Sequence, residues 1–324
     1  MGIEDLSDAG PDFELRKFEV PEALHGQRVD VVLANQIPEF SRSYLQQLID
    51  AGLVRLRGVA AAKPSTKVRV GDAISIELRP TPQTQAFRPE AMALDVVHED
   101  ADVLVLNKPA GLVVHPAPGN WSGTLLNGLL ARDPGAALLP RAGIVHRLDK
   151  DTSGLMVVAR TRQSMDRLVQ AIGARLIRRQ YLAIGHHCWC GDDIVQVDAP
   201  VGRDPRNRLR MAVVDLNHHP GKTASTSVRP LGNGNACCLV ECTLQTGRTH
   251  QIRVHMASLG HPLLGDLLYG GAPLAGLQRQ ALHAYRLAFE HPTSRRMLSF
   301  SAPLPLDMVN AMDALGLRYN HSTE

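Results

Sequence analysis

Residues 144–159 read IVHRLDKDTSGLMVVA, and the fold is organised around this stretch. Ile144 and Val145 are followed by a loop of ionisable and hydroxyl side chains, after which Leu155 opens an apolar run that continues to Ala159. This run predicts a buried β-strand. Catalytic groups tend to lie on loops that a rigid scaffold positions, although the same composition also suits a capped, salt-bridged turn. The stretch therefore predicts a core strand preceded by either an active-site loop or a structural turn.

Length and composition are typical of a soluble protein with two domains. The chain has 324 residues, and single cores usually stop growing at roughly 250 to 300 residues, so we expect one small and one large domain. A hydrophobic fraction of 44% and a charged fraction of 21% are ordinary for a globular protein. No run of about 18 apolar residues could span a bilayer, so no membrane partner is expected.

The first residues and the cysteines indicate the compartment. Residues 1–17 form an acidic tail without the apolar region of a secretory signal, and we expect this tail to be disordered. The five cysteines are odd in number and clustered, whereas a disulfide framework uses an even and distributed set. We therefore expect reduced thiols and a cytoplasmic protein.

Basic residues gather in two segments. Between Ser41 and Arg79 there are seven basic side chains against three acidic ones, and between Arg160 and Arg179 six arginines stand against Asp166 alone. Either segment by itself could be a solvated helix face. Two such segments together favour a polyanion as the partner.

Residues 18–79 have the pattern of one compact unit. Ser41 is a suitable cap for a helix whose apolar side chains share one face, and Gly52 ends that helix. Short strands are predicted afterwards at 54–57 and 73–78. Basic side chains lie on both the helix and the hairpin.

Residues 80–88 contain prolines and polar side chains, a composition that suits a linker, and 89–324 form the second domain. Strand-like segments of this domain lie at 103–106, 155–159, 181–184 and 239–244. The clearest helical pattern begins at Ser164. Its expected buried face consists of Met165, Leu168, Val169, Ile172 and Leu176. We therefore predict a mixed α+β domain.

The first unit resembles an S4 domain, a small RNA-binding module with an α/β-hairpin fold. The matching segments are Arg28-Val29-Asp30, Ser41-Arg42-Ser43, Gly52-Leu53-Val54, Lys63-Pro64-Ser65 and Val70-Gly71-Asp72. The family's usual Asn-Gly turn is replaced here by Arg57-Gly58. The resemblance implies that the unit binds RNA phosphates through Arg42, Arg55, Arg57 and Lys67.

The loop at 146–154 resembles the nucleophile motif of the pseudouridine synthase family typified by the ribosomal large subunit synthases A, C and D. Flanking segments match the same family in order, at 105–109, 113–116, 179–181, 246–255 and 282–284. With the S4 unit, the resemblance extends from residue 18 to about residue 312. It implies a catalytic domain built on a mixed, mainly antiparallel sheet.

The resemblance implies the isomerisation of uridine to pseudouridine, in which the base leaves C1′ through N1 and returns through C5. This reaction has no net redox change, so no cofactor or metal is expected. Asp149 is the implied catalytic carboxylate, which either attacks C1′ or removes a sugar proton, and Arg253 is its implied cationic partner. Tyr181 is implied to stack on the base, Leu282 to pack near it, and Arg147 to fill the gap that a flipped nucleotide leaves.

The S4 unit favours ribosomal RNA as the target. We therefore expect a monomer that acts on 23S ribosomal RNA or on the pre-ribosomal large subunit. Two alternatives stay open: a synthase acting on transfer RNA, and a non-catalytic RNA-binding or ribosome-assembly factor with the same fold. An intact Asp149 disfavours the second alternative, because a pure binder has no need of a carboxylate among phosphates.

Three other motifs do not support competing chemistry. Gly221-Lys222-Thr223 lacks the first glycine of a phosphate-binding loop, since Leu216 stands in its place. The segment from His186 to Cys190 lacks a second pair of ligands at zinc-finger spacing. Ser153 lacks the flanking glycines of a hydrolase nucleophile.

Overall fold

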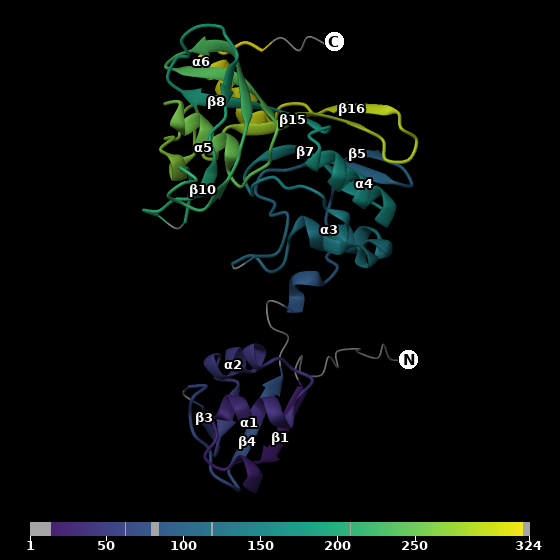
Figure 1. Cartoon of the computed structure of the whole chain (residues 1–324), viewed down its shortest axis with the longest axis vertical. Coiled ribbons are helices and arrows are strands. Elements are labelled where there is room, and N and C mark those ends of the chain that lie inside the picture. The colour runs from purple at the N-terminus through teal and green to yellow at the C-terminus, as the bar shows by residue number, and fades with distance from the viewer. Residues whose placement is uncertain (1–13, 62, 79–83, 118, 208, 320–324) are drawn as a thin grey trace, which may run out of the picture. The chain divides into compact units, whose positions relative to one another are not determined.

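The computed structural model describes residues 14–319 except for 62, 79–83, 118 and 208. The chain divides into two compact units, Met1–Ala86 and Phe87–Glu324 (Figure 1). Most of the predicted acidic tail and the first part of the predicted linker lie outside the described residues. The tail prediction overlaps the structure at 14–17, where the chain already forms a strand.

The first unit packs two helices against a small sheet. Its elements are β1 (Glu14–Glu19), η1 (Glu22–Leu24), α1 (Val29–Gln36), α2 (Arg42–Asp50), β2 (Val54–Leu56), β3 (Val59–Ala60) and β4 (Ala73–Leu78). The sheet is antiparallel with the order β1-β4-β2-β3. Ser41 caps α2 as predicted, because its hydroxyl accepts the Tyr44 N–H at 3.3 Å. Strand β1 was missed because its sequence ELRKFE is largely charged.

The turn at Arg57-Gly58 joins β2 to β3. Both residues have a positive φ, 55° for Arg57 and 82° for Gly58, as a two-residue hairpin of this handedness requires. Asparagine tolerates such a φ better than arginine does. Here the side chain of Arg57 is held by two 2.7 Å hydrogen bonds to Asp72, so the tertiary contact supports the unfavourable backbone.

The two helices of this unit are joined through Asp30, whose side chain is fully buried. Its carboxylate accepts hydrogen bonds from Arg28 at 3.0 Å, from Arg42 at 2.8 Å and from Gln46 at 2.6 Å. Burial would raise the pKa of Asp30, but these hydrogen bonds outweigh it and lower the pKa to about 2. The carboxylate therefore stays charged inside the unit.

The second unit is built on one large sheet. Its strands are β5 (Val96–Glu99), β6 (Val103–Lys108), β7 (Ser153–Ala159), β8 (Arg178–His186), β9 (Val195–Val197), β13 (Thr226–Gly234), β14 (Cys237–Leu244), β15 (Leu282–Glu290) and β16 (Met297–Ser301). The order is β5-β6-β7-β15-β8-β14-β13-β9, with β16 paired to β15. Every pairing is antiparallel except that of β7 with β15. The predicted mixed, mainly antiparallel α+β fold is confirmed, and each of the four predicted strands lies within an observed one.

Strand β7 lies at the centre of the core and is buried along its whole length. Met156 and Val158 pack on one face of the sheet, whereas Leu155 and Val157 pack on the other, as the two-residue period of a strand requires. A second, three-stranded sheet has the order β11 (Met211–Val213), β10 (Val201–Arg203), β12 (Gly221–Lys222).

Four α-helices and several short 3-10 helices surround the large sheet. They are α3 (Leu125–Arg132), α4 (Arg162–Gly173), α5 (Gln251–Ser258) and α6 (Leu306–Leu315), with η3 (Pro134–Leu138), η4 (Pro140–Gly143) and η5 (Leu267–Tyr269) (Figure 1). A further 3-10 helix, η2 (Thr84–Phe87), lies at the sequence boundary between the two units. Within the described ranges, none of the helices combines the length and apolarity that a membrane crossing requires.

The predicted apolar face of α4 is wrong in part. Leu168 is buried, but Val169 is 49% and Leu176 is 70% exposed. The helix ends at Gly173, and Arg175 adopts a φ of 62°, so the periodic pattern continues in the sequence after the helix has stopped. Leu176 therefore lies beyond the helix and cannot share its face.

Replacing Asp30 with asparagine should destabilise the first unit at neutral pH by about 2 kcal/mol, because the charged hydrogen bonds to two arginines are lost. The folded-state pKa is below the ordinary 3.8, so this contribution is present above pH 4 and disappears as the pH falls towards 2. Hydrogen exchange of the α1 amides, corrected for intrinsic rates, should separate wild type from Asp30→Asn at pH 7 and bring them together at low pH. A constant difference across this range would contradict the assignment.

Candidate active site

Asp149 lies on the loop that leads into β7. The loop begins where Ile144 forms an isolated bridge with Val158, and Leu148 is buried beside the core. Its end is a turn in which the Thr152 N–H donates to the Asp149 carbonyl at 3.1 Å. These contacts leave the Asp149 side chain 15% exposed, between a rigid strand and solvent.

A buried lysine at the end of β6 binds the backbone of this loop. The Lys108 side chain is fully buried, and its Nζ donates to the carbonyls of Pro109, Leu112 and Lys150 at 2.8 to 2.9 Å. Burial lowers the pKa of Lys108 to about 7, while the nearby carboxylates oppose that shift. Sequence reasoning did not select Lys108, because its partner Lys150 is 42 residues away.

The partner predicted for Asp149 is confirmed in position. The Arg253 Nη1 donates to Asp149 Oδ2 at 3.1 Å, from the first turns of α5. Its Nε and Nη2 donate to Asp266 at 2.7 and 2.8 Å, a two-pronged contact with a carboxylate that is 1% exposed. Burial would lower the pKa of Arg253, but the hydrogen bonds and charges of Asp266 and Asp149 raise it. Asp266 is therefore a supporting residue that sequence reasoning missed.

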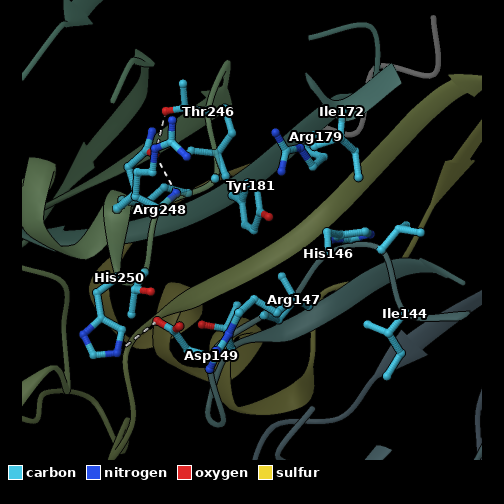
Figure 2. A pocket seen from close by; sticks show the side chains of 18 of the residues that line it. Ile144, His146, Arg147, Asp149, Ile172, Arg179, Tyr181, Thr246, Arg248 and His250 are labelled. Carbon is cyan, nitrogen blue, oxygen red and sulfur yellow. Dashed lines mark hydrogen bonds and ion pairs between the residues drawn. The ribbon is translucent and has the colours of Figure 1, made fainter. Parts of the chain in front are cut away.

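His250 is the second nitrogen-bearing group beside Asp149. Its Nε2 lies 3.9 Å from Asp149 Oδ2, and its Nδ1 lies 2.8 Å from the Tyr269 hydroxyl. That hydroxyl accepts the Met211 N–H at 3.0 Å, so its own proton can go to Nδ1. Burial lowers the pKa of His250, and a neutral ring that accepts the Tyr269 proton at Nδ1 carries its own proton on Nε2, which faces Asp149. Figure 2 shows the two side chains side by side.

All five residues predicted for the second domain line one pocket of about 680 Å³. They are Arg147, Asp149, Tyr181, Arg253 and Leu282. Tyr181 and Leu282 lie on the adjacent strands β8 and β15 and are each 4% exposed, whereas Arg147 is exposed. Burial raises the pKa of Tyr181 to about 12. In Figure 2 Tyr181 lies across the pocket from Asp149, and Arg147 is drawn at the Asp149 end of the view.

The pocket is rich in arginine. Besides Arg253, its lining arginines are Arg141, Arg147, Arg175, Arg179 and Arg248. Asp149 is the one acidic residue among the described residues that line it. Burial lowers the pKa of His115, another lining residue, to about 4, so that ring is neutral. A concave site with this charge suits a polyanionic ligand.

The first unit presents its predicted RNA contacts in two ways. Arg55 and Lys67 are exposed and have no ion pair with another described residue. Arg42 pairs with Asp30, and Arg57 pairs with Asp72, although both arginine side chains stay about half exposed. Phosphate binding by these four residues stays a prediction. Arg55 and Lys67 are the two whose charges no carboxylate of the described residues already engages.

One cluster in the described ranges has the residue types of a metal site. Oxygen atoms of Asp100 and Asp102 lie within 4.8 Å of a nitrogen of His291. Both ring nitrogens of His291 are engaged, because Nε2 bonds Asp100 at 3.1 Å and Nδ1 accepts the Thr293 and Ser294 N–H groups. Because both nitrogens of His291 already have hydrogen-bond partners, we interpret this cluster as a hydrogen-bond network and not as a metal site. Cys188 and Cys190 are exposed free thiols.

Known proteins match both units. The family model described as RNA pseudouridylate synthase matches residues 102–258, and the S4 domain model matches residues 27–74. The human protein "RNA Pseudouridylate Synthase Domain Containing 1" has a solved structure that matches with a TM-score of 0.52 and 28% identity, over 66% of this chain and 84% of that one. These matches confirm the resemblance of each unit.

Two curated relatives match over most of their length. The ribosomal large subunit pseudouridine synthase D of Neisseria meningitidis serogroup A is 48% identical over 92% of this chain and 81% of its own. The protein of the same name from Xanthomonas campestris pv. campestris is 47% identical over 97% of this chain and 96% of its own. Within the family, the HPAPGN segment at 115–120, the PRAG segment at 140–143 and the AIGH segment at 183–186 resemble synthase D, and these relatives confirm that closer resemblance.

Replacing Arg253 with lysine should lower kcat about a hundredfold, because an ammonium cannot bridge Asp266 and also orient Asp149. RNA affinity should change little, since the positive charge is kept. Single-turnover rates at saturating RNA, together with a separate binding titration, measure the two effects. Arg295→Lys, at an exposed pair with Glu290, is the matched control and should behave as wild type. A loss confined to binding would contradict the positioning role.

Proposed function

This chain belongs to the RNA pseudouridylate synthase family, and from that premise we propose that it isomerises uridines of large-subunit ribosomal RNA to pseudouridine. The single observation that carries the mechanism is the Asp149 carboxylate, held by Arg253 at 3.1 Å inside an arginine-lined pocket. The target class is supported by the relatives, which are named ribosomal large subunit pseudouridine synthase D. The chain carries an S4 domain, and RNA is its substrate.

Asp149 supplies the carboxylate that the reaction needs. Attack on C1′ and removal of a sugar proton both require an ionised oxygen that points into the pocket and is held still. The guanidinium of Arg253 pairs with Oδ2 and fixes its position, and the His250 Nε2 faces the same oxygen at 3.9 Å. The geometry serves either route, because both break the C1′–N1 bond and both need a fixed carboxylate oxygen beside the sugar.

Tyr181 supplies a flat apolar face and a hydroxyl on the opposite wall. A pKa of about 12 keeps its phenol protonated at neutral pH, so it can donate a hydrogen bond but does not begin the reaction as a base. Stacking of the uracil on this ring would keep the detached base in the pocket while it turns. Leu282, on the neighbouring strand, closes the same wall with apolar surface.

Arg147 lies at the exposed side of the pocket, two residues before Asp149. A uridine within folded RNA reaches Asp149 only after leaving its stack, which costs a few kcal/mol. A guanidinium that stacks in the vacated place offsets part of this cost, and the exposed position of Arg147 allows it to reach out of the pocket. This role also explains why an arginine so close to Asp149 makes no ion pair with it among the described contacts.

We also propose that the protein works in the cytoplasm as a monomer without a cofactor. The isomerisation neither gains nor loses electrons, so its chemistry calls for no redox cofactor. All five cysteines are free thiols, which suits a reducing compartment. A non-catalytic assembly factor is disfavoured because the buried Arg253–Asp266 pair would then orient a carboxylate that repels the RNA.

Pseudouridine mapping of total RNA tests the target. Cells that lack the protein should lose pseudouridine at defined positions of large-subunit ribosomal RNA, and wild type should restore them. Asp149→Asn keeps the size of the side chain and removes its charge, so it should bind RNA and fold normally yet restore less than about 1% of the modification. Loss confined to transfer RNA positions would instead favour the alternative target, and restoration by Asp149→Asn would contradict the catalytic role.

A chain that begins at residue 87 should fold and keep the chemical step, because the residues of the site all belong to the second unit. Its main defect should be weaker binding or poorer choice of ribosomal site, since the tethered S4 unit raises the effective concentration of the catalytic unit on RNA. Single-turnover measurements at saturating RNA separate affinity from chemistry. A folded but inactive truncated chain would mean that the S4 unit helps to build the site.

A further inference from the structure

Arg179 is a largely buried residue whose guanidinium forms no ion pair with another described residue. Its side chain lies on β8 and lines the pocket, yet the residue is only 6% exposed. No ion pair or side-chain hydrogen bond joins it to the described part of the chain, and its enclosed Nε has no acceptor. A buried charge is costly unless it is paired, so this cation is prepared for an anion that comes from outside the protein.

The surroundings of Arg179 leave room for its guanidinium. Gly247 lies directly beside it, and a Cβ at Gly247 would be 2.8 Å from the Arg179 Nη1. The one lining carboxylate, Asp149, already accepts a hydrogen bond from Arg253. Gly247 therefore places no side chain against the guanidinium of Arg179, and Asp149 is already engaged by Arg253.

His146 brings a second unused donor to the same wall. Its Nε2 accepts the Val157 N–H at 3.1 Å, so the proton of the neutral ring is on Nδ1, which is enclosed and has no partner. Burial and then the charge of Arg179 lower the pKa of His146 to about 3, so the ring stays neutral at physiological pH. Figure 2 shows His146 and Arg179 around one side of the pocket, apart from Asp149 and His250.

We propose that Arg179 binds one backbone phosphate of the RNA next to the target uridine. The proposal rests on the proposed function, and it assigns a phosphate site separate from the catalytic carboxylate. Arg179 and Tyr181 are two residues apart on one face of β8, a separation of about 6 to 7 Å, over which one nucleotide can place its base and its phosphate. The forked guanidinium matches the oxygens of a phosphate better than a single base carbonyl.

Arg178 provides a matched control. It precedes Arg179 on the same strand, but its side chain is exposed and does not line the pocket. Both arginines carry the same charge, so Arg178→Gln and Arg179→Gln change the net charge equally. Any difference between the two variants therefore reports position and not overall electrostatics.

The probe is deproteinised large-subunit ribosomal RNA that has been partly ethylated at its phosphates. RNA bound by wild type, Arg178→Gln or Arg179→Gln is separated from free RNA, and the ethylated positions depleted from the bound fraction are mapped. Wild type and Arg178→Gln should both reject RNA ethylated at one phosphate beside the modified uridine. Arg179→Gln should bind RNA without ethyl groups about tenfold more weakly than wild type does. It should still reject RNA ethylated at other contacted phosphates, but it should bind RNA with or without an ethyl group at that one phosphate equally well.

An identical ethylation pattern in wild type and folded Arg179→Gln would overturn the proposal. Should Arg179→Gln fail to fold, Gly247→Ala displaces the guanidinium by its methyl group while the charge is kept, and it should weaken discrimination at the same phosphate. Pseudouridine formation in the same RNA is read separately. Wild type that binds with this pattern but forms no pseudouridine would therefore refute the proposed function and not the phosphate site.

Discussion

The guanidinium of Arg253 is shared between two carboxylates, and the organisation of the site depends on this sharing. Asp266 takes two of its nitrogens inside the core, and Asp149 takes the third at the edge of the pocket. The buried pair fixes the orientation of the fork, so the remaining N–H can point only towards the loop before β7. An arginine with one partner could rotate about that contact. Because Asp266 fixes the guanidinium of Arg253 in the core, the third N–H also fixes the position of Asp149 Oδ2.

The same loop is held by basic side chains from two further segments of the chain. Lys108, at the end of β6, binds the Lys150 carbonyl at 2.9 Å, and Arg279 binds the Asp151 carbonyl at 2.9 Å. Arg279 is itself fixed by two hydrogen bonds to Asp307 at the start of α6. A loop normally has freedom because its backbone groups face water. Here consecutive carbonyls are bound by side chains that come from distant parts of the sequence.

The parallel pairing of β7 with β15 determines how closely the loop before β7 approaches the pocket wall that β15 contributes. Ser153 and Gly154 pair with His283 and Ala284, which places Leu282 beside the catalytic loop. Gly154 has a φ of 117°, and a Cβ there would lie 2.3 Å from the Ala284 carbonyl. Only glycine permits this approach, so the glycine in the loop motif is a condition for closing the pocket wall and not for chemistry.

The sequence predicted the helices and strands whose apolar residues have a clear period, and the site residues that belong to a family motif. It did not predict the site residues whose roles depend on contacts with distant parts of the chain. Asp149, Tyr181 and Arg253 were predicted from motifs, and the buried strands from apolar runs. Asp266 was missed as a site residue because a lone charged residue gives no local sign of its partner. Lys108 and Arg179 lie in segments that match the family, but the sequence does not show that their side chains are buried or what they face. The end of α4 was missed because its apolar period runs past Gly173, where the helix stops.

The way in which the loop before β7 is held limits what can be transplanted. A protein engineer who moved residues 146–154 to another strand-and-loop scaffold would carry over the carboxylate of Asp149 and the preceding arginine. Lys108 and Arg279, which hold the loop backbone, and Arg253, which holds the Asp149 side chain, would stay behind, because they belong to three other segments of the chain. The nine-residue motif is thus a signature of this site and not a portable module, and grafting the activity requires moving the sheet with it.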